Sequence, residues 1–150
     1  MILRLRTPFW GQLERGRYRR AGFFQVPDAL FPTFWTPYPA PAPVLVAWAG
    51  GPRAQRLAGS DPATLVRHAA ESLQALFGSA VDVDAQLQGG YVHDWQTDPF
   101  ARGAYSYVQV GGDGARRALA EPLRDTLYFA GEATDYTGEC ATVAGALQSG

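Results

Sequence analysis

The stretch that most constrains this chain is LYFAGEATDYTGECATVAGALQSG, residues 127–150. Its apolar run, residues 127–130, has the length and aromatic content of a buried strand, and Gly131 allows a sharp turn after it. After a polar loop, the pattern from Ala141 onward predicts a helix. A helix this short is marginal in water by itself because helix nucleation is costly. The segment therefore needs stabilising contacts from outside itself.

Composition narrows the class of protein. A chain of 150 residues with a net charge of −1 fits one domain, and we expect no nucleic-acid partner. The basic run RGRYRR at residues 15–20 is interpreted as a solvated loop, with contact to phosphate as the alternative. The single cysteine, Cys140, excludes an intrachain disulfide. Without a long apolar segment or a secretory signal, we expect no membrane partner and a cytoplasmic protein.

The local patterns predict an α+β fold. Residues 2–6 and 44–49 are read as strands, the second one buried, and residues 31–35 as an edge strand because Pro32 cannot donate to a central ladder. The proline-rich residues 36–43 are read as a stiff loop between two strands, with a polyproline-like linker or a peptide ligand for an aromatic groove as the alternatives. A helix is predicted over residues 62–77, where Asp61 is the N-cap, Pro62 takes the first position and Gly78 ends it.

Residues with metal-binding chemistry are few. Asp82 and Asp84 lie on one side of an extended segment, but no further ligands follow in a matching pattern, so they are read as an exposed strand edge. No metal site is predicted. The chain also contains no G-x-G-x-x-G and no P-loop.

Two segments carry a specific pattern: WQTDPFARGAYSY at residues 95–107, and the C-terminal stretch. Their order is a tryptophan, Asp-Pro-aromatic, Gly-small-Tyr-Ser, Phe-Ala-Gly-Glu and Ala-Thr-Val-x-Gly-Ala-x-x-Ser-Gly. This pattern resembles the C-terminal portion of the flavin-containing amine oxidase family, which includes polyamine oxidases and flavin-dependent histone lysine demethylases. The resemblance covers nearly the whole chain and is weakest at residues 11–27. It implies that residues 1–94 are part of the substrate-binding domain, with a piece of its sheet and a helix, and that residues 95–150 are the C-terminal strand-turn-helix of the FAD-binding domain.

The resemblance also implies that FAD is the cofactor. Glu132 would accept hydrogen bonds from the ribityl hydroxyls, and the Val143 N–H would meet the pyrimidine edge of the flavin. Trp95 and Tyr105 would pack against the isoalloxazine, and Tyr105 and Thr142 would also face the substrate amine. The rest of the implied cofactor-binding set is Ala104, Gly131 and Ala141.

In such enzymes an amine C–N bond is oxidised to an imine and O₂ is reduced to H₂O₂, and the resemblance implies a small-molecule amine substrate. Two family elements have no counterpart here. The Gly-rich dinucleotide-binding motif is missing, and the lysine near the flavin would precede Met1; all 13 basic residues are arginines. No catalytic residue is therefore predicted. We expect the last third of an amine oxidase, incompetent alone, whose partner is an N-terminal half carrying the dinucleotide-binding motif.

Two other interpretations stay open. One is a non-catalytic interaction module derived from an amine oxidase, which would use its proline-rich and aromatic surface to bind a protein. The other is a different flavoprotein, such as an amino-acid oxidase or a desaturase, which the Asp-Pro-Phe and Gly-Ala-Tyr segments make less favoured.

Overall fold

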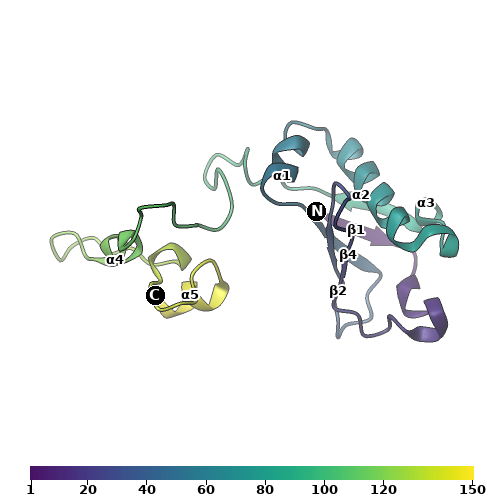
Figure 1. Cartoon of the computed structure of the whole chain (residues 1–150), viewed down its shortest axis with the longest axis horizontal. Coiled ribbons are helices and arrows are strands. Elements are labelled where there is room, and N and C mark those ends of the chain that lie inside the picture. The colour runs from purple at the N-terminus through teal and green to yellow at the C-terminus, as the bar shows by residue number, and fades with distance from the viewer. The chain divides into compact units, whose positions relative to one another are not determined.

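The computed structural model describes residues 1–150 and has an α+β architecture. The chain divides into two compact units, Met1–Asp94 and Trp95–Gly150 (Figure 1). This division coincides with the domain boundary that the sequence predicts. The assignment of the units to a substrate-binding domain and an FAD-binding domain stays a prediction.

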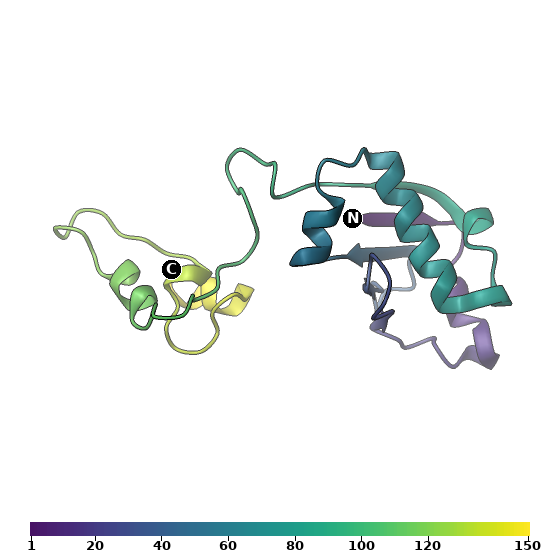
Figure 2. The same ribbon diagram turned by 45° about the horizontal axis from the view of Figure 1, so that its top comes forward.

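An antiparallel sheet of five strands forms the N-terminal unit, in the order β2-β3-β4-β1-β5. The strands are β1 (Ile2–Leu5), β2 (Phe23–Gln25), β3 (Thr33–Trp35), β4 (Val44–Trp48) and β5 (Leu87–Tyr91). The helices are α1 (Pro52–Leu57), α2 (Pro62–Phe77) and α3 (Val83–Gln86), with 3-10 turns η1 (Phe9–Gly11), η2 (Leu13–Gly16) and η3 (Gly78–Ala80). Helix α2 lies along one face of the sheet (Figure 2).

Helix α2 matches its prediction from Pro62 to Phe77. The Asp61 carboxylate accepts a hydrogen bond from the Thr64 N–H at 3.0 Å, and this bond satisfies one of the unpaired donors at the helix start. At the other end, Gly78 takes a φ of 55°, which ends the helix and favours glycine. None of the helices combines the length and the apolar composition needed to cross a bilayer.

The prediction of an edge strand at residues 31–35 is wrong, because β3 lies between β2 and β4. Pro32 precedes the paired residues, and its carbonyl accepts a hydrogen bond from the Val26 N–H at 2.7 Å. The missing N–H of Pro32 is therefore not needed by the ladder. The strand predicted to be buried at residues 44–49 is present as β4, but only one of its faces is buried, since its side chains alternate between buried and exposed.

Asp82 does not lie on a strand edge, as the sequence had suggested, but at the start of α3. Its carboxylate accepts a hydrogen bond from the Ala85 N–H at 3.0 Å and so caps that helix. Aspartate has a strong preference for this position, and a local cap of this kind competes well with a short strand.

The hydrophobic core lies between the sheet and α2. Leu3, Phe34, Leu45 and Leu73 have no exposed surface. An aromatic group extends this core, since the Phe77 ring at the end of α2 packs edge-on against Phe9 and Phe24, with both centroid distances at 5.3 Å. Burial of these side chains is the main source of stability for the N-terminal unit.

The other face of the sheet carries a continuous row of exposed apolar side chains, one from each strand. The strand register places them side by side in the order Phe23, Trp35, Val46, Ile2 and Tyr91. They are 36% to 62% exposed. This set is called the apolar row below. Soluble proteins rarely leave contiguous apolar surface uncovered without a partner.

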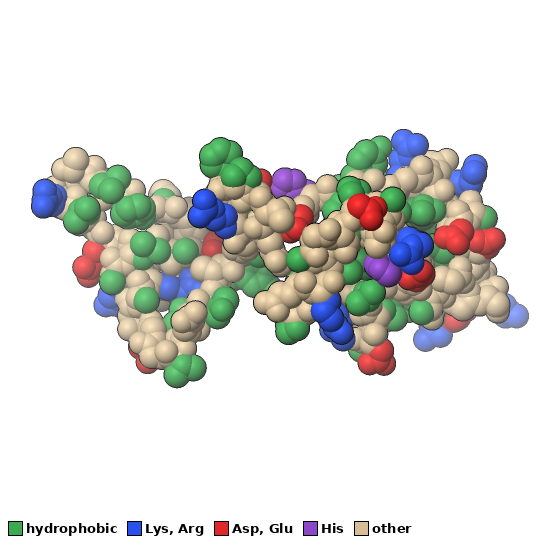
Figure 3. Space-filling model, turned by 90° about the horizontal axis from the view of Figure 1, so that it is seen from above, with side chains coloured by type: hydrophobic (Ala, Val, Ile, Leu, Met, Phe, Trp, Pro, Cys, Tyr) green, Lys and Arg blue, Asp and Glu red, His purple; other side chains and the backbone are tan.

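The C-terminal unit contains only short elements: α4 (Ala115–Ala120), the 3-10 turn η4 (Glu132–Thr134) and α5 (Val143–Gln148). None of the buried hydrophobic side chains of the chain belongs to it. Hydrophobic side chains reach the surface in both units (Figure 3).

The buried strand predicted at residues 127–130 is absent. Only an isolated bridge joins Leu123 and Leu127, and the Tyr128 and Phe129 side chains are 65% and 48% exposed. A buried strand needs a hydrogen-bonded neighbour and cover on both faces, and no other part of this unit supplies either.

We predict that Leu73→Ala destabilises the N-terminal unit by about 2–5 kcal/mol, because it removes a fully buried side chain and leaves a cavity. The measurement is native-state hydrogen exchange of the α2 amides. Leu147→Ala is the matched control, since Leu147 is 78% exposed. Equal exchange rates in the two variants would contradict the packing described here.

Candidate functional site

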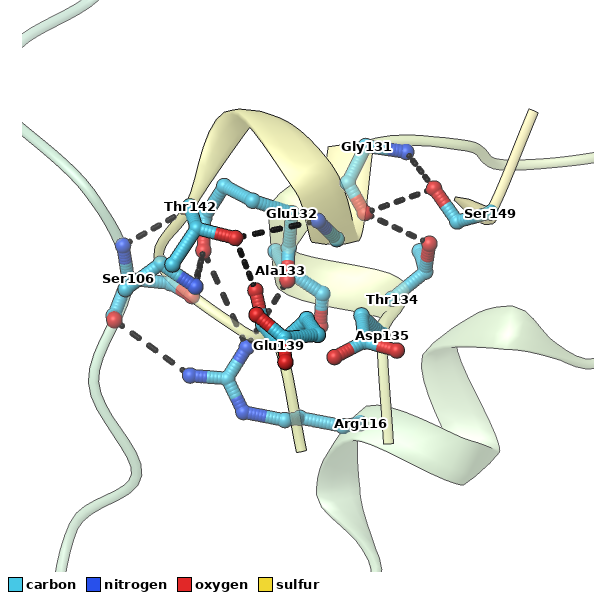
Figure 4. A network of polar contacts seen from close by, with 12 residues as sticks. Ser106, Arg116, Gly131, Glu132, Ala133, Thr134, Asp135, Glu139, Thr142 and Ser149 are labelled. Atoms are coloured by element: carbon cyan, nitrogen blue, oxygen red, sulfur yellow. Dashed lines mark hydrogen bonds and ion pairs between the residues drawn. The ribbon is translucent and has the colours of Figure 1, made fainter. Parts of the chain in front are cut away.

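The carboxylate of Glu132 joins three separate segments of the C-terminal unit (Figure 4). Its Oε1 accepts a hydrogen bond from the Ser106 N–H at 2.8 Å. Its Oε2 accepts from the Ser106 hydroxyl at 2.9 Å and from the Ala141 N–H at 2.8 Å. The Glu132 carboxylate therefore holds three segments together: the residues after Tyr105, its own turn and the residues that lead into α5.

Arg116 of α4 adds a positive charge to this point. Its Nη1 donates to the carbonyls of Glu132 and Ala133 at 3.1 and 3.3 Å, and its Nη2 donates to the Ser106 carbonyl at 3.3 Å. Nη1 also lies 3.8 Å from Glu132 Oε2, with both side chains largely buried. We call Ser106, Arg116, Glu132 and Ala141 the Glu132 cluster.

Two opposing effects act on the pKa of the Glu132 carboxyl. Partial burial raises the pKa, whereas the hydrogen bonds from Ser106 and Ala141 and the charge of Arg116 lower it. The second group of effects wins, and the pKa lies below its ordinary value of 4.5. Glu132 is therefore ionised at neutral pH and acts as an acceptor only.

Helix α5 begins beside the Glu132 cluster. The Thr142 hydroxyl accepts a hydrogen bond from the Gly145 N–H at 3.0 Å and donates one to the Glu139 carbonyl at 2.5 Å. Thr142 is therefore the N-cap of the helix. Val143 is 78% exposed, and its N–H has no acceptor within the chain. This amide is free to donate to a ligand.

Gly131 sits between the predicted strand and the Glu132 turn. Its φ of 144° favours glycine, and a Cβ at this position would meet no atom within 4 Å. Ser149 holds the backbone of Gly131 from the far side: its hydroxyl accepts from the Gly131 N–H at 2.8 Å and donates to the Gly131 carbonyl at 2.9 Å. One side of Gly131 is therefore open to close approach.

The aromatic residues of the predicted site lie on the segment that leads to Ser106. The Gly103 N–H donates to the Trp95 carbonyl at 2.9 Å, so the backbone folds back and brings Trp95 near Ala104. Trp95 and Tyr105 are 59% and 60% exposed. Neither ring is a core residue of this chain.

The structure brings part of the predicted site together, and it links Trp95 to Gly103. Backbone and side-chain bonds to Glu132 join the neighbourhoods of Tyr105, Gly131 and Thr142. Sequence reasoning assigned no role to Ser106 and missed Arg116. Ser106 directly follows Tyr105 in the recognised pattern, which could have indicated it, but nothing in the sequence separates Arg116 from Arg117.

No group of three or more His, Cys, Asp or Glu side chains is placed to hold a metal ion. The chemistry of the site therefore rests on one carboxylate, free backbone donors and exposed aromatic rings. Such a site suits a ligand with hydroxyl donors, carbonyl acceptors and a flat ring system.

We predict that the Ser106 and Ala141 amide resonances titrate together with a midpoint below pH 4.5, because both amides bind the Glu132 carboxylate. A pKa lowered by folding means that the contribution of Glu132 to stability is complete above pH 4.5 and is lost as the pH falls through the folded-state value. Glu132→Gln should abolish this titration, and Glu121→Gln, at an exposed carboxylate outside the cluster, should leave it unchanged. A midpoint above pH 4.5 would contradict the described geometry.

Comparison with known proteins gives the family. The model of the flavin containing amine oxidoreductase family matches residues 1–150. Lysine-specific histone demethylase 1 homolog 3 of Arabidopsis thaliana is 39% identical over 110 residues, which are 73% of this chain and 7% of that protein. Homolog 2 of the same plant is 34% identical over 151 residues, 95% of this chain and 19% of that protein. Lysine-specific histone demethylase 2 of Homo sapiens is 46% identical over 61 residues, 40% of this chain and 7% of that protein.

The chain spans less than a fifth of the length of these relatives. The matched region nevertheless includes both units and the whole Glu132 cluster. The chain belongs to the family of flavin-containing amine oxidoreductases.

Proposed function

We propose that this chain supplies the part of an FAD-dependent amine oxidase that contacts the isoalloxazine and the ribityl chain. The whole enzyme would oxidise an amine C–N bond to an imine and reduce O₂ to H₂O₂. One observation carries this proposal: the Glu132 carboxylate and the start of α5 meet in a single hydrogen-bonded cluster. The same cluster includes the backbone that follows Tyr105.

The residues present fit a flavin. An ionised carboxylate offers about four lone-pair sites. Three internal donors bind Glu132, two of them at Oε2, so Oε1 keeps one site, and the side chain is 25% exposed. It can therefore still accept from a ribityl hydroxyl. The free Val143 N–H can donate to a carbonyl at the pyrimidine edge, and the open side of Gly131 allows a ligand to approach the backbone.

When bound, the flavin supplies the acceptor that takes a hydride equivalent from the carbon next to the amine nitrogen. The chain's own residues hold the flavin and position the substrate amine. Trp95 and Tyr105 offer aromatic surface for the ring and for the amine, and Tyr105 and Thr142 are the proposed substrate contacts. The N–H donor that opens α5 favours negative charge at the flavin edge.

We also propose that this chain works with a polypeptide that carries the dinucleotide-binding motif. Two observations support this proposal. The apolar row leaves one face of the sheet uncovered, and the aromatic side chains of residues 127–130 are exposed although their pattern is that of a buried strand. A second polypeptide would cover the row and pair with residues 127–130, which burial of apolar surface would favour.

The proposed substrate is an amine with an oxidisable C–H bond next to nitrogen. A small-molecule amine is the form that the sequence suggested. The relatives are named lysine-specific histone demethylases, so an N-methylated lysine within a peptide is the second substrate class to test.

An interaction module without catalytic activity is the second candidate function, and the exposure of the apolar row favours it. Such a module would bind its protein partner through the sheet face and would not require flavin. The two candidates therefore differ in whether the complex holds a flavin.

We predict that Val143→Pro weakens flavin binding by up to about 10-fold in the complex with the complementing polypeptide, because it removes one hydrogen-bond donor to a carbonyl of the flavin ring. Proline is well tolerated at the first helical position, and Thr142 already has the extended conformation that a following proline requires, with φ −123° and ψ 161°. The helix should therefore survive. Val143→Ala keeps the N–H and is the matched control. Equal flavin affinities, measured from the change in visible absorbance, would remove Val143 from the site.

We further predict that mixing this chain with a polypeptide of the same family that carries the dinucleotide-binding motif gives a complex with a visible flavin spectrum. That complex should release H₂O₂ with an amine, and parallel assays with spermine and with an N-methyl-lysine peptide separate the two substrate classes. Flavin binding and peroxide release by this chain alone would overturn the dependence on a partner. A complex that forms without flavin would instead support the interaction module.

A further inference from the structure

A groove of about 450 Å³ opens on the N-terminal unit between η1 and the proline-rich loop. Its lining includes Trp10, Gln12, Arg19, Arg20, Tyr38 and Pro39. We call it the arginine groove. Its volume lies in the range of roughly 300–1,000 Å³ that is usual for ligand sites in proteins. The function proposed above does not use it.

Both walls of the groove are held by backbone bonds. On one side, the Gly11 N–H donates to the Pro8 carbonyl at 3.0 Å, and the Arg19 N–H donates to the Gly16 carbonyl at 3.1 Å. On the other side, the Thr36 N–H and hydroxyl donate to the carbonyls of Gly22 and Ala21 at 2.9 and 2.6 Å. The groove is therefore formed before a ligand arrives, which lowers the entropic cost of binding.

The arginines at the groove have no acidic partner. Residues 8–43 contain four arginines and two acidic residues, and one of the acids, Glu14, is occupied by Arg17 and Tyr18 at 3.0 Å each. The hydrogen bonds from Arg17 and Tyr18 lower the pKa of Glu14, which stays charged and paired. No ion pair is formed by Arg19 or Arg20, and both side chains are exposed. The groove rim therefore carries uncompensated positive charge.

Trp10 supplies a donor on the groove wall. Its side chain is 4% exposed and packs edge-on against Phe9 at a centroid distance of 5.6 Å. No acceptor within the chain binds the indole N–H, and this nitrogen is not among the side-chain atoms that are sealed from solvent without a partner. Because Trp10 lines the groove, its unpaired indole N–H is the donor that we assign to a ligand acceptor there.

We propose that the arginine groove binds an acidic peptide segment in extended conformation. A peptide carbonyl accepts from the Trp10 N–H, acidic side chains pair with Arg19 and Arg20, and the half-exposed Tyr38 ring packs against the peptide backbone. An acidic peptide therefore offers a binding partner to each of these three features of the groove. The chain itself supplies no such partner there.

A nucleic acid fits the groove less well. Its affinity depends on many phosphate contacts, but this chain has a net charge of −1 and only two unpaired arginines line the groove. A peptide gains from the indole donor and the aromatic ring as well as from charge. The peptide interpretation therefore uses more of the lining residues.

The test is a nuclear magnetic resonance titration of the full chain with the acetylated peptide Glu-Pro-Glu-Pro-Glu, followed at the indole N–H resonances. The Trp10 signal should shift, and its assignment follows from Trp10→Phe. The paired change Arg19→Gln with Arg20→Gln should weaken binding about tenfold, the loss expected from two exposed ion pairs together. Arg4→Gln with Arg56→Gln removes the same charge outside the groove and should leave binding unchanged.

Three outcomes would overturn the proposal. The first is that the matched peptide Gln-Pro-Gln-Pro-Gln binds as tightly as the acidic one. The second is that the two double arginine variants lose affinity for the acidic peptide equally. The third outcome is a stronger shift of the Trp10 signal with a short single-stranded DNA than with the acidic peptide. Because neither flavin nor a second polypeptide is present, the result is independent of the proposed oxidase function.

Discussion

The C-terminal unit depends on a charged carboxylate more than on a hydrophobic core. Glu132 receives hydrogen bonds from Ser106 and Ala141, and Arg116 lies close enough to balance its charge. No buried apolar side chain belongs to this unit. A charge-assisted hydrogen bond contributes about 1.5–3 kcal/mol, whereas ordering a residue costs about 1–2 kcal/mol of backbone entropy. A few such bonds cannot stabilise the whole unit, so a ligand or partner that adds contacts has a large effect on it.

This balance connects the fold to the proposed function. The bonds that hold the C-terminal unit together also join the Glu132 carboxylate to the backbone that leads into α5, and Glu132 directly follows the open Gly131. A cofactor that bridges them would replace missing apolar burial with specific polar contacts and a large flat surface. Binding and folding of this unit are therefore expected to be coupled. The exposed rings of Trp95 and Tyr105 are in keeping with this view, because ordinary core aromatics would be buried.

The N-terminal unit has the opposite character. Its sheet and α2 enclose a core of buried apolar side chains. Only one face of the sheet is covered, however, and the register aligns an exposed apolar side chain from every strand on the other face. Alternation along each strand produces this result automatically once a single layer of helix covers the sheet. The sheet is thus a stable platform with a surface suited to a protein partner.

The sequence by itself determined the features that depend on near neighbours. These include α2 with its Asp61 cap, the proline-rich loop and the family pattern around Gly131 and Glu132, because caps, turns and motifs are encoded within a few residues. Only the tertiary structure decided the features that depend on distant contacts. It placed β3 inside the sheet, left residues 127–130 unpaired and selected Arg116 to face Glu132. The physical reason is that strand pairing, burial and ion pairing are set by which segments meet, and no local pattern records that choice.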